Sequence, residues 1–304
     1  MNNFFSLIIA SKNEEKDIYL SLDSSLKQKY KNYEIIVIDD STDGTKNIIR
    51  DYQKRFDNLF LIEGDGTGCC NARNKGIYAS KGDIIVFLTA DTILDTNYLL
   101  KLNNFYKDQK TQWITTSAKV YNLDNNYSRF LEFQHQEVES RLNYIPYTTQ
   151  GYSVRKNAAI NVDCISGEKY PFNFCRDWTL GEKLHKKGYK KLHIKELTVF
   201  HKAPNEFEDY FQVRKTRGLM SAYQPYYFFN KNLSYLFIKF LCKSIISFFK
   251  LIFVIPLMID YFKVLKFSDK KLQDFFFLFY PFLLQEFCFR YGELVGLKNI
   301  LKRK

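Results

Sequence analysis

Two apolar, β-branched runs that end in aspartate constrain the fold of this chain more than any other feature. The run 34–38 is followed at once by Asp39, Asp40 and a turn-forming cluster, and the run 83–88 leads within three residues to Asp91. Such runs are typical of buried parallel strands. In an open α/β sheet the ligand crevice lies beyond the carboxyl ends of the strands. We therefore expect these acids to line a polar, metal-binding site for a phosphorylated compound.

Strand and helix signals alternate through the first 110 residues, which predicts an α/β fold with a mostly parallel, doubly wound sheet. The predicted strands are 5–10, 34–39, 59–63, 83–88, 113–121, 151–155, 189–194 and 197–201. The predicted helices are 14–28, 43–56, 68–80, 97–107, 126–141 and 178–187. A change of composition near residue 225 divides the chain into a domain of residues 1–224 and a helical tail of residues 225–304.

The tail is both basic and rich in aromatic residues. The chain is 17% aromatic with a formal charge of +12, and residues 211–304 hold 16 Lys/Arg against 5 Asp/Glu, a local charge of 16 − 5 = +11. Since the cations interrupt apolar helical stretches, an anionic membrane surface is the expected partner. No zinc-finger spacing or aromatic RNA-binding motif is present, so nucleic acid is not expected.

The apolar runs of the tail are too short for a clear transmembrane helix, which needs about 20 apolar residues. The runs 233–249, 251–259 and 275–289 are bounded or interrupted by charged residues. We expect helices in the membrane interface or a shallow re-entrant hairpin, that is, a peripheral or monotopic protein. A pair of membrane spans and an aromatic oligomer interface remain alternatives.

The remaining composition indicates the cytoplasmic side of the membrane. Residues 4–10 form too short an apolar run for a signal peptide, and charged residues follow directly. The six cysteines show no CxxC spacing, so reduced thiols are expected. Small core residues are the favoured interpretation of the adjacent Cys69 and Cys70, and reactive thiols are the alternative.

Five segments follow one another in a fixed order: SLIIASKNE (6–14), VIDDSTDGT (37–45), GCCNARNKG (68–76), KGDIIVFLTAD (81–91) and RDWTL (176–180). Together they resemble the family-two inverting glycosyltransferases of GT-A fold. Each motif alone is weak, but five at this spacing identify the chain as a member, over roughly residues 4–220. The resemblance implies a GT-A fold and a nucleotide-sugar donor.

The resemblance also assigns the nucleotide site. Asp40 corresponds to the acid that accepts the ring N–H of uracil, and Asp39 to one that supports the ribose or the loop. Ser11 and Asn13 correspond to residues lining the base pocket, and Arg73 to a cation facing the base or diphosphate. A helix cap is the alternative for Asp39, and an ion pair with a neighbouring carboxylate is the alternative for Arg73.

The family's metal motif is incomplete in this chain. The resemblance implies Mg²⁺ or Mn²⁺ on the diphosphate, held by Asp-x-Asp, but here the segment is Thr89-Ala90-Asp91. Asp91 is therefore the expected ligand, and Thr89 leaves the metal dependence open. His201 corresponds to a histidine that some relatives bring to the metal or diphosphate, with a structural role as the alternative.

Inversion at the anomeric carbon needs a base that deprotonates the acceptor hydroxyl. The resemblance implies that Asp177 is this base, with a helix-capping acid as the alternative. Arg176 replaces the family's usual acid; it would lower the pKa of Asp177 or bind an anionic acceptor. Downstream, Arg214 and Arg217 are candidates for clamping a diphosphate or the acceptor, and a solvated basic face is the alternative.

Together these features predict an inverting transferase that uses a nucleotide-diphosphate sugar, with UDP favoured. The expected acceptor is a lipid-linked saccharide or surface polysaccharide at the cytoplasmic face of the membrane. Processive synthesis is not expected, because no multi-span channel follows the catalytic region. A degenerate nucleotide-sugar-binding protein and a non-catalytic assembly subunit are the alternative functions.

Overall fold

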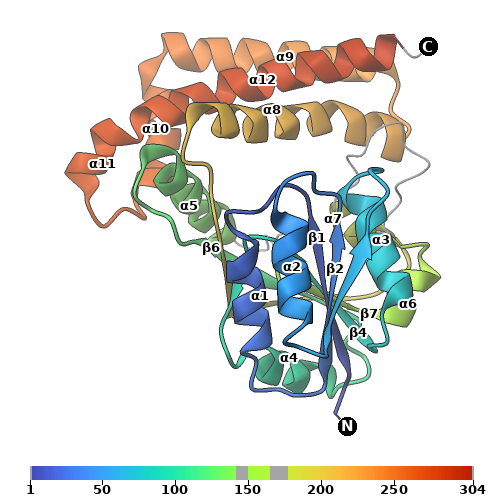
Figure 1. The fold of residues 1–304 in the computed structure, drawn as a ribbon. Coiled ribbons are helices and arrows are strands. Elements are labelled where there is room, and N and C mark those ends of the chain that lie inside the picture. Colours follow the sequence, from blue (N-terminus) through green and yellow to red (C-terminus); the bar gives the residue numbers. More distant parts are fainter. Residues whose placement is uncertain (1, 142–149, 165–176, 303–304) are drawn as a thin grey trace. The chain divides into compact units, whose positions relative to one another are not determined.

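The computed structural model describes residues 2–141, 150–164 and 177–302, and these residues form two compact units (Figure 1). The first unit comprises residues 1–119 and 145–202, and the second comprises residues 120–144 and 203–304. The predicted boundary between residues 224 and 225 falls inside the second unit. The helical unit therefore contains two segments that precede the change of composition: one begins at residue 120, and the other begins at residue 203 and continues into the tail.

The first unit is built on a mixed, mostly parallel sheet with the strand order β3-β2-β1-β4-β7-β6-β8-β5. Strands β1 to β4 pair in parallel, β7 is antiparallel to β4 and β6, and β5 is antiparallel to β8. Their bounds are β1 Phe5–Ser11, β2 Tyr33–Asp39, β3 Leu59–Glu63, β4 Ile84–Thr89, β5 Ile93–Leu94, β6 Trp113–Val120, β7 Tyr152–Arg155 and β8 Lys191–His201. The predicted α/β class is confirmed, with an antiparallel part added to its far edge.

Helices cover both faces of this sheet because successive strand residues are buried on opposite sides. One core contains Leu7, Ile35 and Val86 with side chains of α1 (Ile18–Leu26), α2 (Thr45–Gln53) and α4 (Tyr98–Tyr106). The other contains Ile8 and Ile36 with side chains of α3 (Cys69–Ala79), α6 (Lys156–Asn161) and α7 (Asp177–Lys186). Figure 1 shows α2 and α3 beside β2. Both faces of the central strands are therefore apolar, as their continuous apolar runs predict.

Most predicted elements form within a few residues of their expected bounds, and the exceptions have local causes. The first helix begins at Ile18 because the backbone carbonyl of Glu14 accepts from Asp17 and Ile18, closing a turn after Asn13, which has φ 57°. The two strands expected within 189–201 form the single strand β8. The two-residue strand β5 and the short helix α6 are too brief to give a periodic signal.

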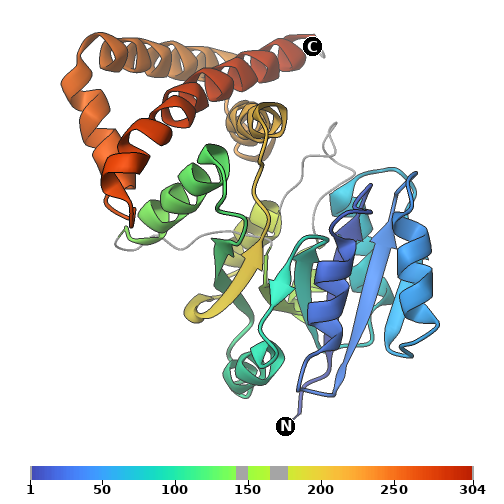
Figure 2. The ribbon, with the colours of Figure 1, turned by 60° about the vertical axis from the view of Figure 1, so that its left-hand side comes forward.

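The second unit is helical. It contains α5 (Asn126–Glu139), α8 (Phe207–Tyr223), the π-helical turn η1 (Gln224–Phe228), α9 (Leu233–Ile252), α10 (Val254–Leu265), α11 (Lys271–Phe277) and α12 (Phe279–Leu301). Its aromatic core includes Phe130, Tyr210, Tyr261 and Phe282. Helices α9 and α12 lie side by side in both views (Figures 1 and 2).

Glycines allow α8 and α12 to pack with their backbones in contact. A Cβ atom on Gly218 would lie 1.9 Å from the carbonyl oxygen of Phe289, and one on Gly292 would lie 2.0 Å from that of Lys215. No side chain fits at either position without moving a helix. This contact explains why α8, although it precedes the aromatic tail in sequence, belongs to the helical unit.

Within residues 2–141, 150–164 and 177–302, no single helix combines the length and apolar character needed to cross a bilayer. Helices α9 and α10 meet the criterion only when they are taken together, and they are bent by 96° at the break between them.

Candidate active site

Three polar segments meet at the carboxyl ends of the central parallel strands. The register pairs Ser11 of β1 with Asp39 of β2, and Ala10 of β1 with Thr89 of β4. Because these strands are parallel neighbours, the loops that follow them begin at one edge of the sheet. The predicted residues Ser11, Asp39 and Asp40, and the segment leading to Asp91, are thus brought to one edge.

Asp40 is half-buried, and the loop after β3 holds its carboxylate. Its Oδ1 accepts a hydrogen bond from the backbone N–H of Gly66 at 2.8 Å, and its own N–H donates to the carbonyl of Ser11 at 3.0 Å. A Cβ atom on Gly64 would lie 1.9 Å from this Oδ1, so the glycine leaves space for the carboxylate. Gly64 is not among the residues predicted from the sequence, although a glycine at the end of a strand can mark a close approach of another group.

Asp39 and Asn13 hold the loops of this edge together. Asp39 is buried, with 1% exposure. Its carboxylate accepts hydrogen bonds from the Ser41 hydroxyl at 2.6 Å and from the Ser41 backbone N–H at 3.2 Å. The Asn13 side-chain oxygen accepts from the N–H of Thr42 at 2.9 Å. These bonds tie the Asp39 carboxylate to the loop that follows β2, and its role toward a ribose stays a prediction.

Ser11 and Arg73 are buried polar residues of the first unit. The Ser11 hydroxyl is buried and has no hydrogen-bond partner in the part of the chain that the structure describes. Burying such a group without a partner is costly, so a site that keeps one is a candidate for ligand contact. Arg73 lies in α3 with 5% exposure.

Asp91 lies next to the end of β8. Strand pairing of Ile93 with Phe200 brings the β4–β5 turn against that strand end. The Oδ2 atom of Asp91 then accepts from the backbone N–H of Lys202 at 3.0 Å. His201 is buried at the end of β8, and its Nδ1 lies 3.0 Å from the carbonyl oxygen of Lys202. The two predicted metal-site residues are therefore gathered around Lys202.

Lys202 was not predicted, yet it connects three parts of this site. Besides its backbone bond to Asp91, its Nζ pairs with both carboxylate oxygens of Asp17, at 2.9 and 2.7 Å. The pair is partly shielded, with side-chain exposures of 35% for Lys202 and 18% for Asp17. The loop after β1, the β4–β5 turn and the end of β8 are joined in this way. A lone lysine after a strand carries no signal of such a role in sequence.

Thr89 takes a structural role where the family motif has its first acid. Its hydroxyl lies 2.7 Å from that of Thr92, and its N–H donates to the Thr92 hydroxyl at 3.1 Å. Among the described residues no group of three or more His, Cys, Asp and Glu side chains could hold a metal ion. Mg²⁺ usually keeps several waters and is held by one or two carboxylates with substrate phosphates. A single carboxylate such as that of Asp91 is compatible with this mode of binding.

Glu14 adds a carboxyl group to the same region, and its pKa is higher than that of an ordinary glutamate. Burial, and then the negative charges of Asp91 and Asp17, raise its pKa to about 7, against a smaller opposing effect of Lys202. Its backbone N–H donates to the Thr45 hydroxyl at 2.8 Å. The first unit therefore gathers Glu14, Asp17 and Asp91 around one lysine.

The predicted base belongs to the first unit, and two of the predicted arginines belong to the second. Asp177 is the first residue of α7, but Arg176 lies outside the described residues. Arg214 and Arg217 belong to α8 of the second unit. Arg214 is 4% exposed, with its guanidinium 5.1 Å from the centre of the Tyr210 ring and 5.6 Å from that of Phe130. A solvated basic face is thus the wrong description of Arg214, which packs among aromatic rings.

Comparison with known proteins matches residues 6–171 to the glycosyl transferase family 2. Glycosyltransferase AglE of Haloferax volcanii is 42% identical over 92 residues, which are 29% of this chain and 30% of the relative. Poly-beta-1,6-N-acetyl-D-glucosamine synthase of Staphylococcus epidermidis is 32% identical over 119 residues, 38% of this chain and 29% of the relative. The alignments thus span about a third of these curated relatives.

Solved structures share the fold. The mannosyltransferase PcManGT of Pyrobaculum calidifontis, in complex with GDP-Man and Mn²⁺, superposes with a TM-score of 0.60 at 16% identity, covering 76% of this chain and 66% of that one. TarS residues 1–349 of S. aureus, in complex with UDP-GlcNAc, gives a TM-score of 0.54 at 18% identity, covering 73% and 66%. The α/β architecture predicted from sequence is therefore that of GT-A-like proteins.

Proposed function

The chain belongs to glycosyl transferase family 2, and we propose that it transfers a sugar from a nucleotide-diphosphate sugar to an acceptor at the cytoplasmic face of the membrane. Inversion at the anomeric carbon is typical of this family. The observation that carries the proposal is the gathering of Ser11, Asp40 and Asp91 near the carboxyl ends of β1, β2 and β4, within the matched segment.

The donor nucleotide is assigned to Asp40, Ser11 and Arg73. The Gly66 N–H fixes the Asp40 carboxylate through Oδ1, so Oδ2 is the oxygen that we assign to the ring N–H of uracil. The buried Ser11 hydroxyl would gain its missing partner from the same ligand. Both UDP-GlcNAc and GDP-Man appear in structures of similar fold, and Asp40 favours the uridine donor.

Asp91 would hold Mg²⁺ or Mn²⁺ together with diphosphate oxygens, and His201 is a second candidate ligand. Such a cation neutralises the charge that develops on the leaving diphosphate. Lys202 and Asp17 keep the Asp91 loop at the end of β8, so they position this ligand.

Asp177 is assigned as the base that takes the proton of the acceptor hydroxyl. It is the first residue of α7. Removing a positioned general base typically costs about 10²–10⁴-fold in rate.

The exposed apolar surface of α9 and α10 supports the membrane as the place of reaction. Ile238, Ile245, Phe248, Phe253 and Ile255 are 60%, 53%, 62%, 58% and 75% exposed. Residues 225–304 hold 13 Lys/Arg and 5 Asp/Glu, a charge of 13 − 5 = +8. Apolar side chains with basic neighbours suit helices that lie in the interface of an anionic membrane. The acceptor that fits this setting is a lipid-linked saccharide or a growing surface polysaccharide.

One observation favours a second candidate, a protein that binds sugar nucleotide without turnover. Thr89 stands in place of the first metal acid, and its hydroxyl is occupied by Thr92. The presence of Asp177 at the start of α7 favours catalysis over this alternative.

Both candidates are tested by supplying labelled sugar nucleotides to the full chain with membrane extract as acceptor source, with Mn²⁺ or EDTA. We expect one donor, a uridine nucleotide, to transfer its label to extractable lipid or polymer. Asp177→Ala should lose the transfer and keep nucleotide binding. Saturable binding without transfer or nucleotide release from any donor would establish the binding protein instead.

A further inference from the structure

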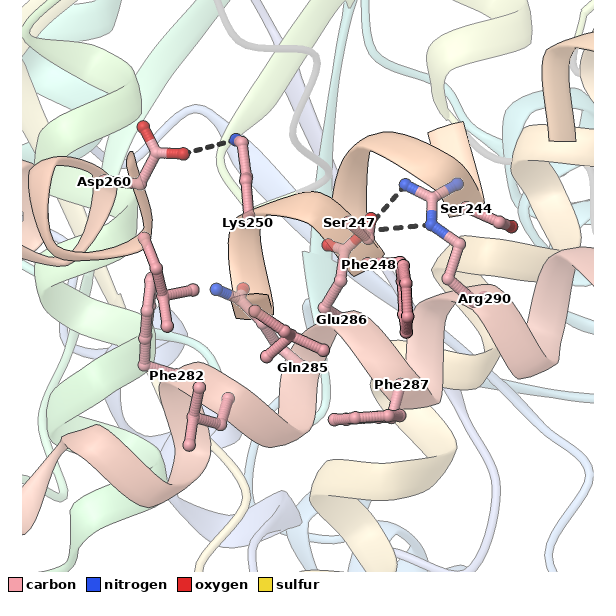
Figure 3. A pocket seen from close by; sticks show the side chains of 13 residues that line it. Ser244, Ser247, Phe248, Lys250, Asp260, Phe282, Gln285, Glu286, Phe287 and Arg290 are labelled. Carbon is pink, nitrogen blue, oxygen red and sulfur yellow. Dashed lines mark hydrogen bonds and ion pairs between the residues drawn. The ribbon is translucent and has the colours of Figure 1, made fainter. Parts of the chain in front are cut away.

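The second unit contains a hollow of about 370 Å³ that the transferase site does not use. It lies between α9, α10 and α12, and its walls are mainly apolar, with Phe248, Phe282 and Phe287 among the lining side chains (Figure 3). Phe248 and Phe287 are 62% and 60% exposed. The apolar wall is therefore open at its mouth, where a long hydrocarbon chain could enter.

A second, more polar hollow of about 530 Å³ adjoins the first. The two share Asp260, Phe282 and Gln285, and the polar one is also lined by Arg141 and Lys263. An apolar compartment and a polar compartment with shared walls fit a ligand that has an apolar chain and a charged head.

The charges at the junction leave one cation in excess. Asp260 accepts from Lys250 at 2.5 Å through Oδ2 and from Lys263 at 2.8 Å through Oδ1, a local charge of 2 − 1 = +1. Arg141 is balanced by Glu137 at 2.8 Å. Either lysine can turn toward an anion without leaving Asp260 unpaired. Both are accessible, since their side chains are 40% and 53% exposed.

The other charged groups of the apolar hollow carry no excess positive charge, because Arg290 pairs with both Glu286 and Glu293. Glu286 accepts from Arg290 at 2.8 Å and from the Ser247 hydroxyl at 2.5 Å. Figure 3 shows this group and the Lys250–Asp260 pair on two sides of the hollow, with Gln285 between them. The site for an anion is thus the Lys250–Lys263 side.

We propose that these two hollows bind one anionic membrane phospholipid, with its phosphate at Lys250 and Lys263 and one acyl chain in the apolar hollow. The inference rests on the membrane association put forward above and adds a specific lipid site to it. The phosphodiester of such a lipid carries one negative charge, which offsets the excess positive charge. The rings of Phe248, Phe282 and Phe287 bury the acyl chain.

The test is native mass spectrometry of the full chain, released from detergent, titrated with phosphatidylglycerol or phosphatidylcholine. The wild type should take up one phosphatidylglycerol saturably and bind phosphatidylcholine at least tenfold more weakly. Lys250→Gln and Phe287→Glu should each weaken phosphatidylglycerol binding about tenfold. The matched controls are Lys271→Gln and Phe276→Glu, exposed positions of α11 outside both hollows, and they should bind as the wild type does.

Several results would overturn the inference. Equal losses in Lys250→Gln and Lys271→Gln would mean general surface attraction, and equal binding of the two lipids would mean that no headgroup site exists. Competition by glycerol phosphate as strong as that by the lipid would mean a phosphate site without a chain pocket. UDP binding, measured separately, keeps the two proposals apart. A protein that binds UDP but no lipid contradicts only this inference, and the converse contradicts only the proposed donor site.

Discussion

The two units of this chain differ in where their large apolar side chains lie. The first unit buries its apolar side chains on both faces of a sheet and gathers polar groups at the ends of its parallel strands. The second unit exposes large apolar side chains along α9 and α10 and buries polar ones, such as Arg214 and Asp274, among its helices. The first arrangement is suited to holding a small polar ligand, and the second to meeting an apolar, anionic surface.

The units also differ in what holds their key residues. In the first unit, Asp40 and Asp91 are fixed by backbone amides from distant parts of the chain, namely Gly66 and Lys202. In the second unit, α8 and α12 are held by backbone contact at Gly218 and Gly292. A change to the site should therefore alter ligand binding with little effect on folding, and a change at the glycines should do the reverse.

The largest effect should come from Asp177→Ala, which would separate chemistry from binding in the first unit. Loss of the base should lower the transfer rate by about 10²–10⁴-fold. UDP affinity, measured by calorimetry, should stay within about twofold. A variant that retains the wild-type rate would remove Asp177 from the mechanism.

Gly292→Ala should affect the second unit alone. The new Cβ atom would overlap the Lys215 carbonyl, and such overpacking typically costs about 1–3 kcal/mol. We expect the thermal unfolding of the helical unit, followed by calorimetry, to move to lower temperature while UDP binding persists. Leu294→Ala, at an exposed position of α12, is the matched control. Loss of UDP binding together with helix stability would break the distinction between the two units.

Lys202→Met tests whether Lys202 positions Asp91 as the metal ligand. When Lys202 can no longer pair with Asp17, the segment that holds Asp91 loses one of its contacts, and we expect the Mn²⁺ affinity in the presence of UDP to fall about 2- to 5-fold. Electron paramagnetic resonance of free Mn²⁺ measures this directly. Lys202→Arg should restore the affinity, and Lys195→Met, an exposed lysine of β8, should not change it. Equal effects of both methionine variants would remove the positioning role.

A separate prediction is a pH dependence of the unfolding free energy that is caused by Glu14. Its pKa is raised to about 7 in the folded state, so folding favours the protonated form and the unfolding free energy falls as the pH rises from about 4.5 to 7. After allowance for solvent screening, the contribution is about 1–2 kcal/mol. Denaturant unfolding without divalent metal should show this slope in the wild type and lose it in Glu14→Gln. An unchanged slope in the variant would assign the dependence to other groups.

The sequence predicts much of the first unit because its strands have a clear sequence signal. Continuous apolar runs such as 35–38 and 84–88 can be buried on both faces only in a covered parallel sheet, and the acids that follow then share one edge. Ser11, Asp40 and Asp91 could be placed near that edge for this reason. The hydrogen bonds from the Gly66 and Lys202 backbone could not be predicted, because they depend on loops whose course no periodic pattern specifies.

The second unit was less predictable because composition describes a surface better than it describes packing. The aromatic and basic bias indicates helices that carry exposed apolar residues, and α9 shows them. It does not reveal that Gly218 and Gly292 draw α8 into this unit, nor that Arg214 packs against the Phe130 ring of α5. Contacts between helices more than 70 residues apart leave no local signal in a single sequence.

The most direct test of the central claim is calorimetric binding of UDP to the full chain and to Asp40→Asn. We expect saturable binding to the wild type and at least tenfold weaker binding, about 1.4 kcal/mol, to the variant. Asp57→Asn, an exposed aspartate between α2 and β3, should bind as the wild type does. Equal affinity of Asp40→Asn and the wild type would contradict the assignment of the nucleotide to this edge of the sheet.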